Sequence, residues 1–495
     1  MGYVLLLTTF AVCFGSSSLI GYNLGVVNLP GDLIKAYMKD AWKLNDNQLE
    51  VSYGQVSGVF VIAAAIGAFS CGWVADGLGR RNSLMLNNII GIIGALMCAP
   101  CVKTKQPGLL FGGRFLSGLN SGITIGVASL YLTEIAPLNL RGFIGACHQL
   151  AVTMGIVISY CATIKQAFNT DTLWPLAIAI GAIPPAVSCF LLPMCPESPR
   201  YLYLIKNREE DAKKAYARLN PEGVDMFTAE MREEAEAAKK QPEFKFMQLF
   251  KQPDLRLPVA IAVLIQVLQQ LSGINAWTHT IAYTRLDEPR QIWSASVKEA
   301  QIQYFVMAIG VLNVVCTIVA LPLLERAGRR TLLLWPTFVL GVTLLLLTVM
   351  VCILDSKPEN QKEPYAVGCV VLLFIYIACF AVGLGPIPAL IVAELFRQGP
   401  RTAAYSLSQS VQWLCNLMVL LTFPVLNKTM KGYVYLPFFG VVVVCWMFFF
   451  VFMPETKNKT FDEIAKAFAS NSNVSNSAQY YRSGSKRPTL LSRFE

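Results

Sequence analysis

The chain has 495 residues, of which 54% are hydrophobic and 15% are charged, and its mean hydropathy is +0.49. This composition excludes an ordinary soluble domain, in which about 25% of residues are charged. The formal net charge of +10 is not a nucleic-acid signal, because the basic residues follow the sidedness of a membrane and do not form one patch.

Apolar runs long enough to cross a bilayer, about 20 residues each, recur along the whole chain. The first does not resemble a signal peptide, because it lacks a basic start and a small-residue cleavage site. We therefore predict an all-α membrane protein with twelve transmembrane helices. They lie at 3–27, 56–75, 84–102, 109–132, 142–164, 174–195, 255–283, 304–323, 331–354, 366–393, 404–424 and 433–453.

The loops between these spans differ in charge. Those on one side, together with the tail after 453, carry 26 Lys and Arg, against 13 on the other side. Cytoplasmic loops are the basic ones, so this count predicts that both termini and the long loop at 196–254 are cytoplasmic. A multi-pass protein of the plasma membrane is expected.

All fourteen cysteines fall in spans or at their ends, which favours small packing residues over disulfides. No loop pairs His and Cys at metal-ligand spacing, and we expect neither a metal nor a cofactor.

The loop between the sixth and seventh spans is the one sizeable soluble piece. Residues 200–240 are rich in Glu, Lys, Ala and Arg, which predicts short helices lying against the cytoplasmic face. The Ser- and Asn-rich tail from Ser470 is expected to be disordered. An Asn-Lys-Thr sequon at Asn427 falls in the last predicted external loop, whereas those at Asn458 and Asn473 face the cytoplasm.

The seventh span carries amides that are unusual inside a membrane. Gln269, Gln270 and Asn275 surround Gly273, where a helix can bend. Unpaired polar groups are costly in that environment. The amides therefore indicate either a lining for an uncharged, hydroxylated ligand or hydrogen bonds to a neighbouring helix.

Three motifs occur twice in the same order. Gly79-Arg80-Arg81 returns 249 residues later, Glu134 followed by Arg141 returns 260 residues later, and Pro196-Glu197-Ser198 returns as Pro454-Glu455-Thr456. This duplication predicts two pseudo-symmetric six-helix halves with a site between them. The expected divisions are 1–195 and 255–453 for the halves, 196–254 for a helical linker and 454–495 for a cytoplasmic tail.

The motifs resemble the facilitative sugar transporters of the major facilitator superfamily, close to the animal glucose and fructose carriers. The resemblance covers about residues 12–464. It rests on Gly21-Tyr22-Asn23, Asp76-Gly77-Leu78-Gly79-Arg80-Arg81, Gly113-Arg114-Phe115, Pro196-Glu197-Ser198-Pro199-Arg200, the run from Gln269 to Ala276, Gly385-Pro386-Ile387-Pro388 and Pro454-Glu455-Thr456-Lys457.

The resemblance implies a sugar site near mid-membrane, made by amides that donate to and accept from sugar hydroxyls. The implied binding residues are Gln149, Gln269, Gln270, Asn275, Asn313, Trp413 and Asn416.

The repeated charged motifs are the expected cytoplasmic gate, whose ion pairs between the halves close the inner side. The alternative is static anchoring of the topology by arginine. The gate residues are Arg80, Arg81, Glu134, Arg141, Glu325, Arg329, Arg330, Glu394 and Arg401. The run from Gly383 to Pro388 predicts a broken tenth span that serves as a hinge.

Departures from the family bear on substrate and coupling. Proton-coupled relatives place Asp where this chain has Asn23, which predicts uniport. Ala389 replaces the usual Trp and Ala381 the usual Glu, which predicts a thinner wall and acceptance of fructose beside glucose. His279 and Thr280 replace an aromatic pair, Gln266-Val267-Leu268 replaces a Gln-Leu-Ser run, and Gln412 replaces Asn.

Other functional classes fit less well. The chain has no Gly-x-x-x-x-Gly-Lys-Ser/Thr loop for an ATP-driven pump, and two isolated histidines do not make an enzyme site. A duplicated monomer with mid-span amides does not favour a channel. A facilitative hexose uniporter is the prediction. A sugar sensor built on a transporter fold, or a carrier of a polyol-like or urate-like solute, remains the alternative.

Overall fold

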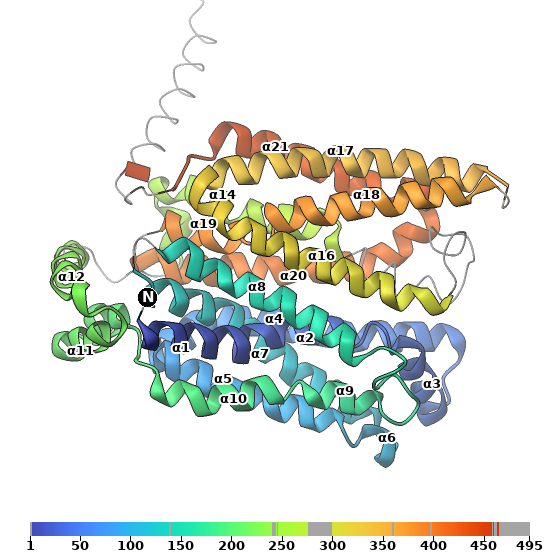
Figure 1. The fold of residues 1–495 in the computed structure, drawn as a ribbon, viewed down its shortest axis with the longest axis horizontal. Helices are drawn as coiled ribbons and strands as arrows, with labels where there is room; N and C mark the ends of the chain where they lie inside the picture. Colours follow the sequence, from blue (N-terminus) through green and yellow to red (C-terminus); the bar gives the residue numbers. More distant parts are fainter. Residues whose placement is uncertain are drawn as a thin grey trace, which may run out of the picture.

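The computed structural model describes residues 2–137, 140–239, 244, 246–275, 299–358, 361–396, 398–457, 459, 463 and 464. Within them the chain is helical and forms no strand. Figure 1 shows an elongated bundle of roughly parallel helices, with the blue-to-green helices on one side and the yellow-to-red helices on the other. We call residues up to 195 the N-terminal half and residues from 255 to 453 the C-terminal half.

The N-terminal half packs α7 against both α4 and α5, and α2 against α8. Its sixth span is interrupted at Gly181–Ala182, between α9 and α10. The elements are α1 (Tyr3–Val12), the π-helical η1 (Cys13–Ser17), α2 (Ser18–Gly25), α3 (Gly31–Trp42), α4 (Asp46–Leu78), α5 (Arg80–Cys98), α6 (Cys101–Thr104), α7 (Pro107–Ile135), α8 (Arg141–Ala162), α9 (Trp174–Ile180), α10 (Ile183–Leu191) and η3 (Leu192–Met194).

The linker forms short helices, as predicted, and they lie outside the bundle at the end where the N-terminus also lies (Figure 1). We call this end of the bundle the linker end. The linker elements are η4 (Tyr201–Ile205), α11 (Glu209–Leu219), η5 (Pro221–Gly223), α12 (Val224–Lys239) and α13 (Gln248–Lys251).

The C-terminal half contacts the other half mainly through two helix pairs, α20 with α4 and α16 with α8. Its tenth span is broken between α18 and α19, as expected, at residues 383–386. The elements are α14 (Pro253–Leu271), α16 (Glu299–Ala327), α17 (Arg329–Ser356), α18 (Glu363–Val382), α19 (Ile387–Leu395), α20 (Gln398–Met430), η7 (Lys431–Tyr435) and α21 (Leu436–Phe452).

Eleven helical segments of the described chain are long and apolar enough to cross a membrane. The remaining predicted span corresponds to α5, whose 19 residues include Arg80, Arg81, Asn87 and Asn88 and are therefore less hydrophobic. It nevertheless packs within the bundle against α7. The all-α membrane fold is confirmed.

Local sequence explains where helices start and stop. Asn45 and Gln48 form a capping box at the start of α4. Gly79 and Gly328 occupy equivalent turns, between α4 and α5 and between α16 and α17, with φ of +90° and +84°. Glycine adopts that conformation readily, which explains why both copies of the Gly-Arg-Arg motif begin with it.

The seventh span bends at the glycine where the sequence allowed it. Helix α14 ends at Leu271, and the chain turns at Ser272 and Gly273, whose φ is +96°. Residues 276–298, including Trp277, His279 and Thr280, lie outside the described residues. The Asn427 sequon lies in the last turns of α20 and not in a loop, because that helix continues to Met430.

All fourteen cysteines are free thiols, as predicted. The predicted disordered tail and the sequons at Asn458 and Asn473 lie outside the described residues.

Candidate sugar site and linker-end clusters

A cavity of about 190 Å³ lies between the two halves. Helices α2, α4, α7 and α8 line it from one side, and α14, α16, α18 and α20 from the other. All seven predicted binding residues reach this cavity: Gln149, Gln269, Gln270, Asn275, Asn313, Trp413 and Asn416. The structure therefore brings together side chains that are up to 267 positions apart in the sequence, from 149 to 416.

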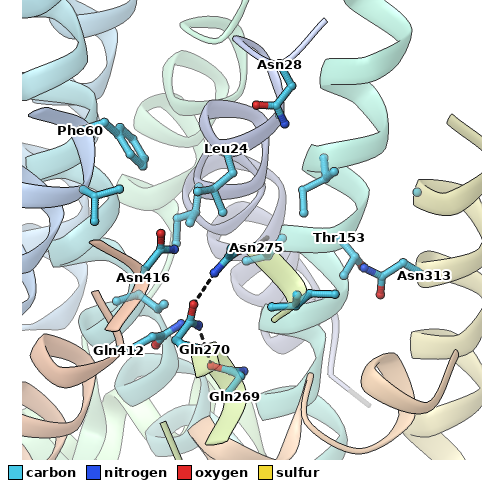
Figure 2. A pocket seen from close by; sticks show the side chains of 18 of the residues that line it. Leu24, Asn28, Phe60, Thr153, Gln269, Gln270, Asn275, Asn313, Gln412 and Asn416 are labelled. Carbon is cyan, nitrogen blue, oxygen red and sulfur yellow. Dashed lines mark hydrogen bonds between the residues drawn. The ribbon is translucent and has the colours of Figure 1, made fainter. Parts of the chain in front are cut away.

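Three of these amides form a chain of hydrogen bonds, drawn as dashed lines in Figure 2. The Asn275 amide donates to Gln270 Oε1 at 2.5 Å, and Gln270 Nε2 donates to Gln269 Oε1 at 3.2 Å. Gln269 Nε2 then donates to the carbonyl of Leu384 at 2.7 Å. The chain connects the break in the seventh span to the break in the tenth.

A second contact joins the seventh-span break to the α18 helix. The Tyr376 hydroxyl of α18 donates to the carbonyl of Ser272 at 3.0 Å, and the Ser272 hydroxyl donates to the carbonyl of Gln269 at 2.8 Å. Both breaks leave main-chain groups without their helical partners. Side chains of the neighbouring helix satisfy two of these groups.

The helix break changes what spacing alone implied. On a straight helix, Gln269 and Gln270 would point about 100° apart. Both reach the cavity, because it extends around the end of α14, and the turn at Gly273 brings Asn275 back toward Gln270.

Several lining residues were not predicted. Asn28, Ser57, Thr153 and Gln412 add polar groups, and Arg114, His148 and Tyr160 add ionisable ones. Figure 2 shows Asn28 at the top of the view, Gln270 in its lower half and Thr153 at the right, next to Asn313. Gln412 had been singled out only as a departure from the family, and Arg114 only as part of a motif.

Arg114 is a buried cation at the cavity wall. Its Nη1 donates to the carbonyl of Asn23 at 2.9 Å, and its guanidinium lies 4.3 Å from the centre of the Phe60 ring. Among the described residues that line the cavity, none is a carboxylate. The cation is stabilised by a carbonyl dipole and a ring face instead.

His148 is the other ionisable group that sequence reasoning missed. It is buried, and its Nδ1 lies 2.8 Å from the Ser17 hydroxyl in the π-helical turn of the first span. Its position immediately before Gln149 was the available signal. Within the described residues, no three His, Cys, Asp or Glu side chains gather in a way that could hold a metal ion.

The tenth-span wall of the cavity differs from the prediction, which assigned it to Ala381 and Ala389. Neither alanine lines the cavity; Ile377 and Phe380 represent the tenth span there. Ala381 is buried in helix packing, and the carbonyl of Ala389 accepts a hydrogen bond from Tyr405 at 2.6 Å. Ala381 directly follows Phe380 and so points about 100° away from it around α18, and the break at residues 383–386 separates Ala389 in α19 from that helix.

The first charged cluster lies at the linker end of the N-terminal half. Arg80 makes a bidentate pair with Glu134, with Nε at 2.8 Å and Nη2 at 3.0 Å from the two carboxylate oxygens. Ser198 donates to Glu134 at 2.5 Å. Glu197 accepts the main-chain N–H groups of Arg80 and Arg81 at 2.8 and 3.1 Å. A carboxylate at the start of α5 is favourable for the helix dipole.

The C-terminal half repeats this cluster. Arg329 places Nε and Nη2 at 3.1 and 2.9 Å from Glu394 Oε1, and Thr456 donates to Glu394 at 2.5 Å. Glu455 accepts the main-chain N–H groups of Arg329 and Arg330 at 2.9 and 3.0 Å. The three repeated motifs of the sequence thus meet at one point in each half.

The ion pairs of these two glutamates that the described residues show lie inside each half. Glu134 pairs with Arg80, and Glu394 pairs with Arg329. Glu325 lies 3.9 Å from Arg329. Arg401 donates to the carbonyl of Phe396 at 3.1 Å.

Two other predicted gate arginines donate hydrogen bonds to main-chain carbonyls, and the side chain of a third is outside the described residues. Arg81 donates to the carbonyl of Cys195 at 3.2 Å and Arg330 to that of Phe450 at 2.7 Å. Helix α8 begins at Arg141, but its side chain lies outside the described residues. These bonds tie the ends of helices together within each half.

The halves themselves meet closely at the linker end. A Cβ placed on Gly142 would lie 2.1 Å from Glu325 Oε1 of the other half, so only glycine fits without a shift. Cys71 of α4 lies 3.5 Å from the Ser406 hydroxyl of α20. The two halves are therefore in contact between the cavity and the linker end, and we call this arrangement the closed linker end.

Comparisons with known proteins agree with this geometry. Residues 8–468 match the family model "Sugar (and other) transporter". The facilitated glucose transporter member 4 of Mus musculus is 34% identical over 94% of this chain and 90% of its own length. Member 1 of Gallus gallus is 34% identical over 90% of each chain.

The fold is also that of solved major facilitator structures. The proton:xylose symporter XylE bound to 6-bromo-6-deoxy-D-glucose superposes with a TM-score of 0.79 at 21% identity, covering 94% of this chain and 99% of that one. An inward-open form of XylE from E. coli gives 0.68 at 21% identity, covering 93% and 99%. Because the family model and the relatives both span most of its length, this chain belongs to the sugar transporter family.

Proposed function

We propose that the protein is a facilitative hexose carrier, which takes up glucose, fructose or both by alternating access across the plasma membrane. The observation that carries the proposal is the central cavity, lined by amides from both halves. Each amide offers donors and an acceptor to a sugar hydroxyl, and the relatives named above are facilitated glucose transporters. The family is one of transporters, not enzymes.

Weak individual bonds suit a carrier. A neutral hydrogen bond contributes about 0.5–1.5 kcal/mol net, so several amides together bind a hexose only moderately and release it readily. We assign binding to the seven predicted residues and add Asn28, Thr153 and Gln412, which share the cavity.

In this proposal the linker end faces the cytoplasm, together with both termini, as the charge bias of the loops supports. The chain divides into two halves, at 1–195 and 255–453, with 196–254 as the linker and 454–495 as the tail. In each half, one charged cluster holds the helix ends together. The halves then rock as bodies about the cavity. Contacts such as Gly142 with Glu325 separate when the inner side opens.

We further propose uniport. Asn23 cannot exchange a proton in the physiological range, and among the described residues lining the cavity none is a carboxylate. His148 favours a second candidate, proton-coupled transport, because it is a titratable group at the cavity.

The test is uptake of radiolabelled D-glucose and D-fructose into proteoliposomes that contain the purified protein. Saturable equilibration of either hexose, inhibited by the other if both bind, supports the carrier. A protein that binds hexose but moves none is a sensor. Transport of a polyol or urate without transport of hexose would replace the proposed substrate class.

A further inference from the structure

Two glutamines lie one helical turn beyond the cavity, toward the linker end. Gln266 precedes Gln269 by three residues in α14, and Gln409 precedes Gln412 by three residues in α20. Residues three apart lie on neighbouring positions of one helix face. Both helices run away from the linker end, so each glutamine lies about 5 Å closer to that end than the cavity lining.

Both side chains are buried without their full set of hydrogen bonds. Gln266 and Gln409 are each 1% exposed. Neither the nitrogen nor the oxygen of the Gln266 amide has a hydrogen-bond partner, and Gln409 Oε1 also has none. A buried amide that lacks partners destabilises a protein, whereas an apolar side chain of the same length does not. Packing in this conformation therefore gives no reason for an amide at either position.

The helix that carries Gln409 links the cavity to the closed contact between the halves. Asn416, Trp413, Gln409 and Ser406 follow one another at intervals of three and four residues, so they form one stripe along α20. Asn416 and Trp413 line the cavity, and Ser406 contacts Cys71 of the other half. When the linker end opens, this stripe and the neighbouring face of α14 become accessible from the cavity.

We propose that Gln266 and Gln409 form a second sugar station on the cytoplasmic side of the central cavity, used as the hexose leaves or enters from that side. The inference rests on the proposed function. With the linker end closed, both polar atoms of the Gln266 amide and the Oε1 of Gln409 lack partners. With it open, sugar hydroxyls supply the donors and the acceptor that these atoms need. The sugar-loaded, inward-open form is thereby stabilised relative to the closed form.

Two substitutions test the station on separate helices. Gln266→Met and Gln409→Met keep the length of the side chain and remove the amide. The matched control is Thr337→Val in α17, which also removes an unpaired, buried polar group but lies away from the cavity. Each variant is reconstituted in proteoliposomes of known orientation, and the KM of D-glucose and of D-fructose is measured from each face.

The expected result is asymmetric. Each Met variant raises KM from the cytoplasmic face roughly two- to tenfold, the value of one neutral hydrogen bond, and leaves KM from the external face unchanged. Its thermal midpoint stays at or above that of the native protein, because an unpaired amide is gone. Thr337→Val leaves KM at both faces unchanged.

Three results would overturn the station. Unchanged KM at both faces in both Met variants would show that the amides have no role in transport. Equal rises at both faces would assign them to the central site. A native protein that moves no hexose in either direction would overturn the proposed function itself, and the station with it.

Discussion

The two charged clusters are built from equivalent residues of the repeated motifs but differ in how deeply they are buried. In the N-terminal half, the Arg80 and Glu134 side chains are 0% and 1% exposed, and the arginine contacts both carboxylate oxygens. In the C-terminal half, Arg329 and Glu394 are 5% and 17% exposed, and both arginine nitrogens share one oxygen. Two copies of one motif therefore need not contribute equally to the free energy of unfolding, because the contribution of an ion pair depends on how far it is desolvated.

The cavity shows the opposite kind of asymmetry. The C-terminal half supplies Gln269, Gln270 and Asn275 as a connected chain that ends at the tenth-span break. Gln149 of the N-terminal half makes no side-chain hydrogen bond within the described residues. The N-terminal half thus has the more buried linker-end cluster, and the C-terminal half has the more connected cavity lining.

The largest expected effect is on folding. Arg80→Ala leaves Glu134 buried without its cation, which costs about 3–5 kcal/mol; Arg329→Ala should cost clearly less, because Glu394 is partly exposed. Thermal unfolding of the detergent-purified variants measures the difference. Adding Glu134→Ala to Arg80→Ala should recover part of the loss. Equal losses in the two single variants would contradict the burial argument.

The next effect is on transport. Gln149→Leu, Gln269→Leu, Gln270→Leu and Asn275→Leu should each reduce hexose uptake about 5- to 100-fold, since sugar hydroxyls left unpaired cost about 1–3 kcal/mol each. Gln269→Leu should also lower the thermal midpoint, because the Leu384 carbonyl loses its donor. Gln149→Leu should not. Full uptake in all four variants would show that the sugar binds elsewhere.

Measurements of proton movement distinguish uniport from proton-coupled transport. A uniporter should not alkalinise the medium on adding sugar, and a protonophore should not change its final accumulation. If either effect appears, His148 is the group to test, because it lines the cavity and is titratable. His148→Gln would then abolish the coupling while leaving sugar equilibration, whereas persistence of coupling would exclude the histidine.

Selectivity should depend on Phe380 more than on the alanines first suspected. Phe380→Ala removes a ring from the cavity wall and should weaken glucose binding by up to about tenfold. Ala389→Trp should change the ratio of glucose to fructose uptake less, because Ala389 does not line the cavity. Competition between the two sugars in each variant measures this. A larger change at position 389 would restore the original interpretation.

The smallest effect is expected in the linker. The hydrogen bond from Lys213, followed by one from Arg232, holds the pKa of Glu209 below its usual value, yet all three groups are solvent-exposed. A lowered carboxylate pKa stabilises above the unfolded value, and the contribution is lost as pH falls through the folded pKa. Exposed pairs contribute little, so Glu209→Gln should not measurably change the thermal midpoint at neutral pH. A clear decrease that disappears in acid would reveal a role for α11 in holding the bundle.

Much of this protein was predictable from local pattern. Hydrophobic length located the spans, because a bilayer demands about 20 apolar residues whatever their neighbours. The duplicated motifs predicted two halves and named the arginines and carboxylates that cluster. The amides around Gly273 indicated the cavity, since such groups are rarely left in a membrane without a function.

Pairing, orientation and closure depended on the folded chain. Glu134 pairs with Arg80, 54 positions away in sequence, because the ends of α5 and α7 meet at the linker end. Phe380 lines the cavity and Ala381 and Ala389 do not, because helix rotation and the break at residues 383–386 decide which side chains face it. Sequence patterns report the environment that a residue needs, whereas its partner is decided by where distant helices pack.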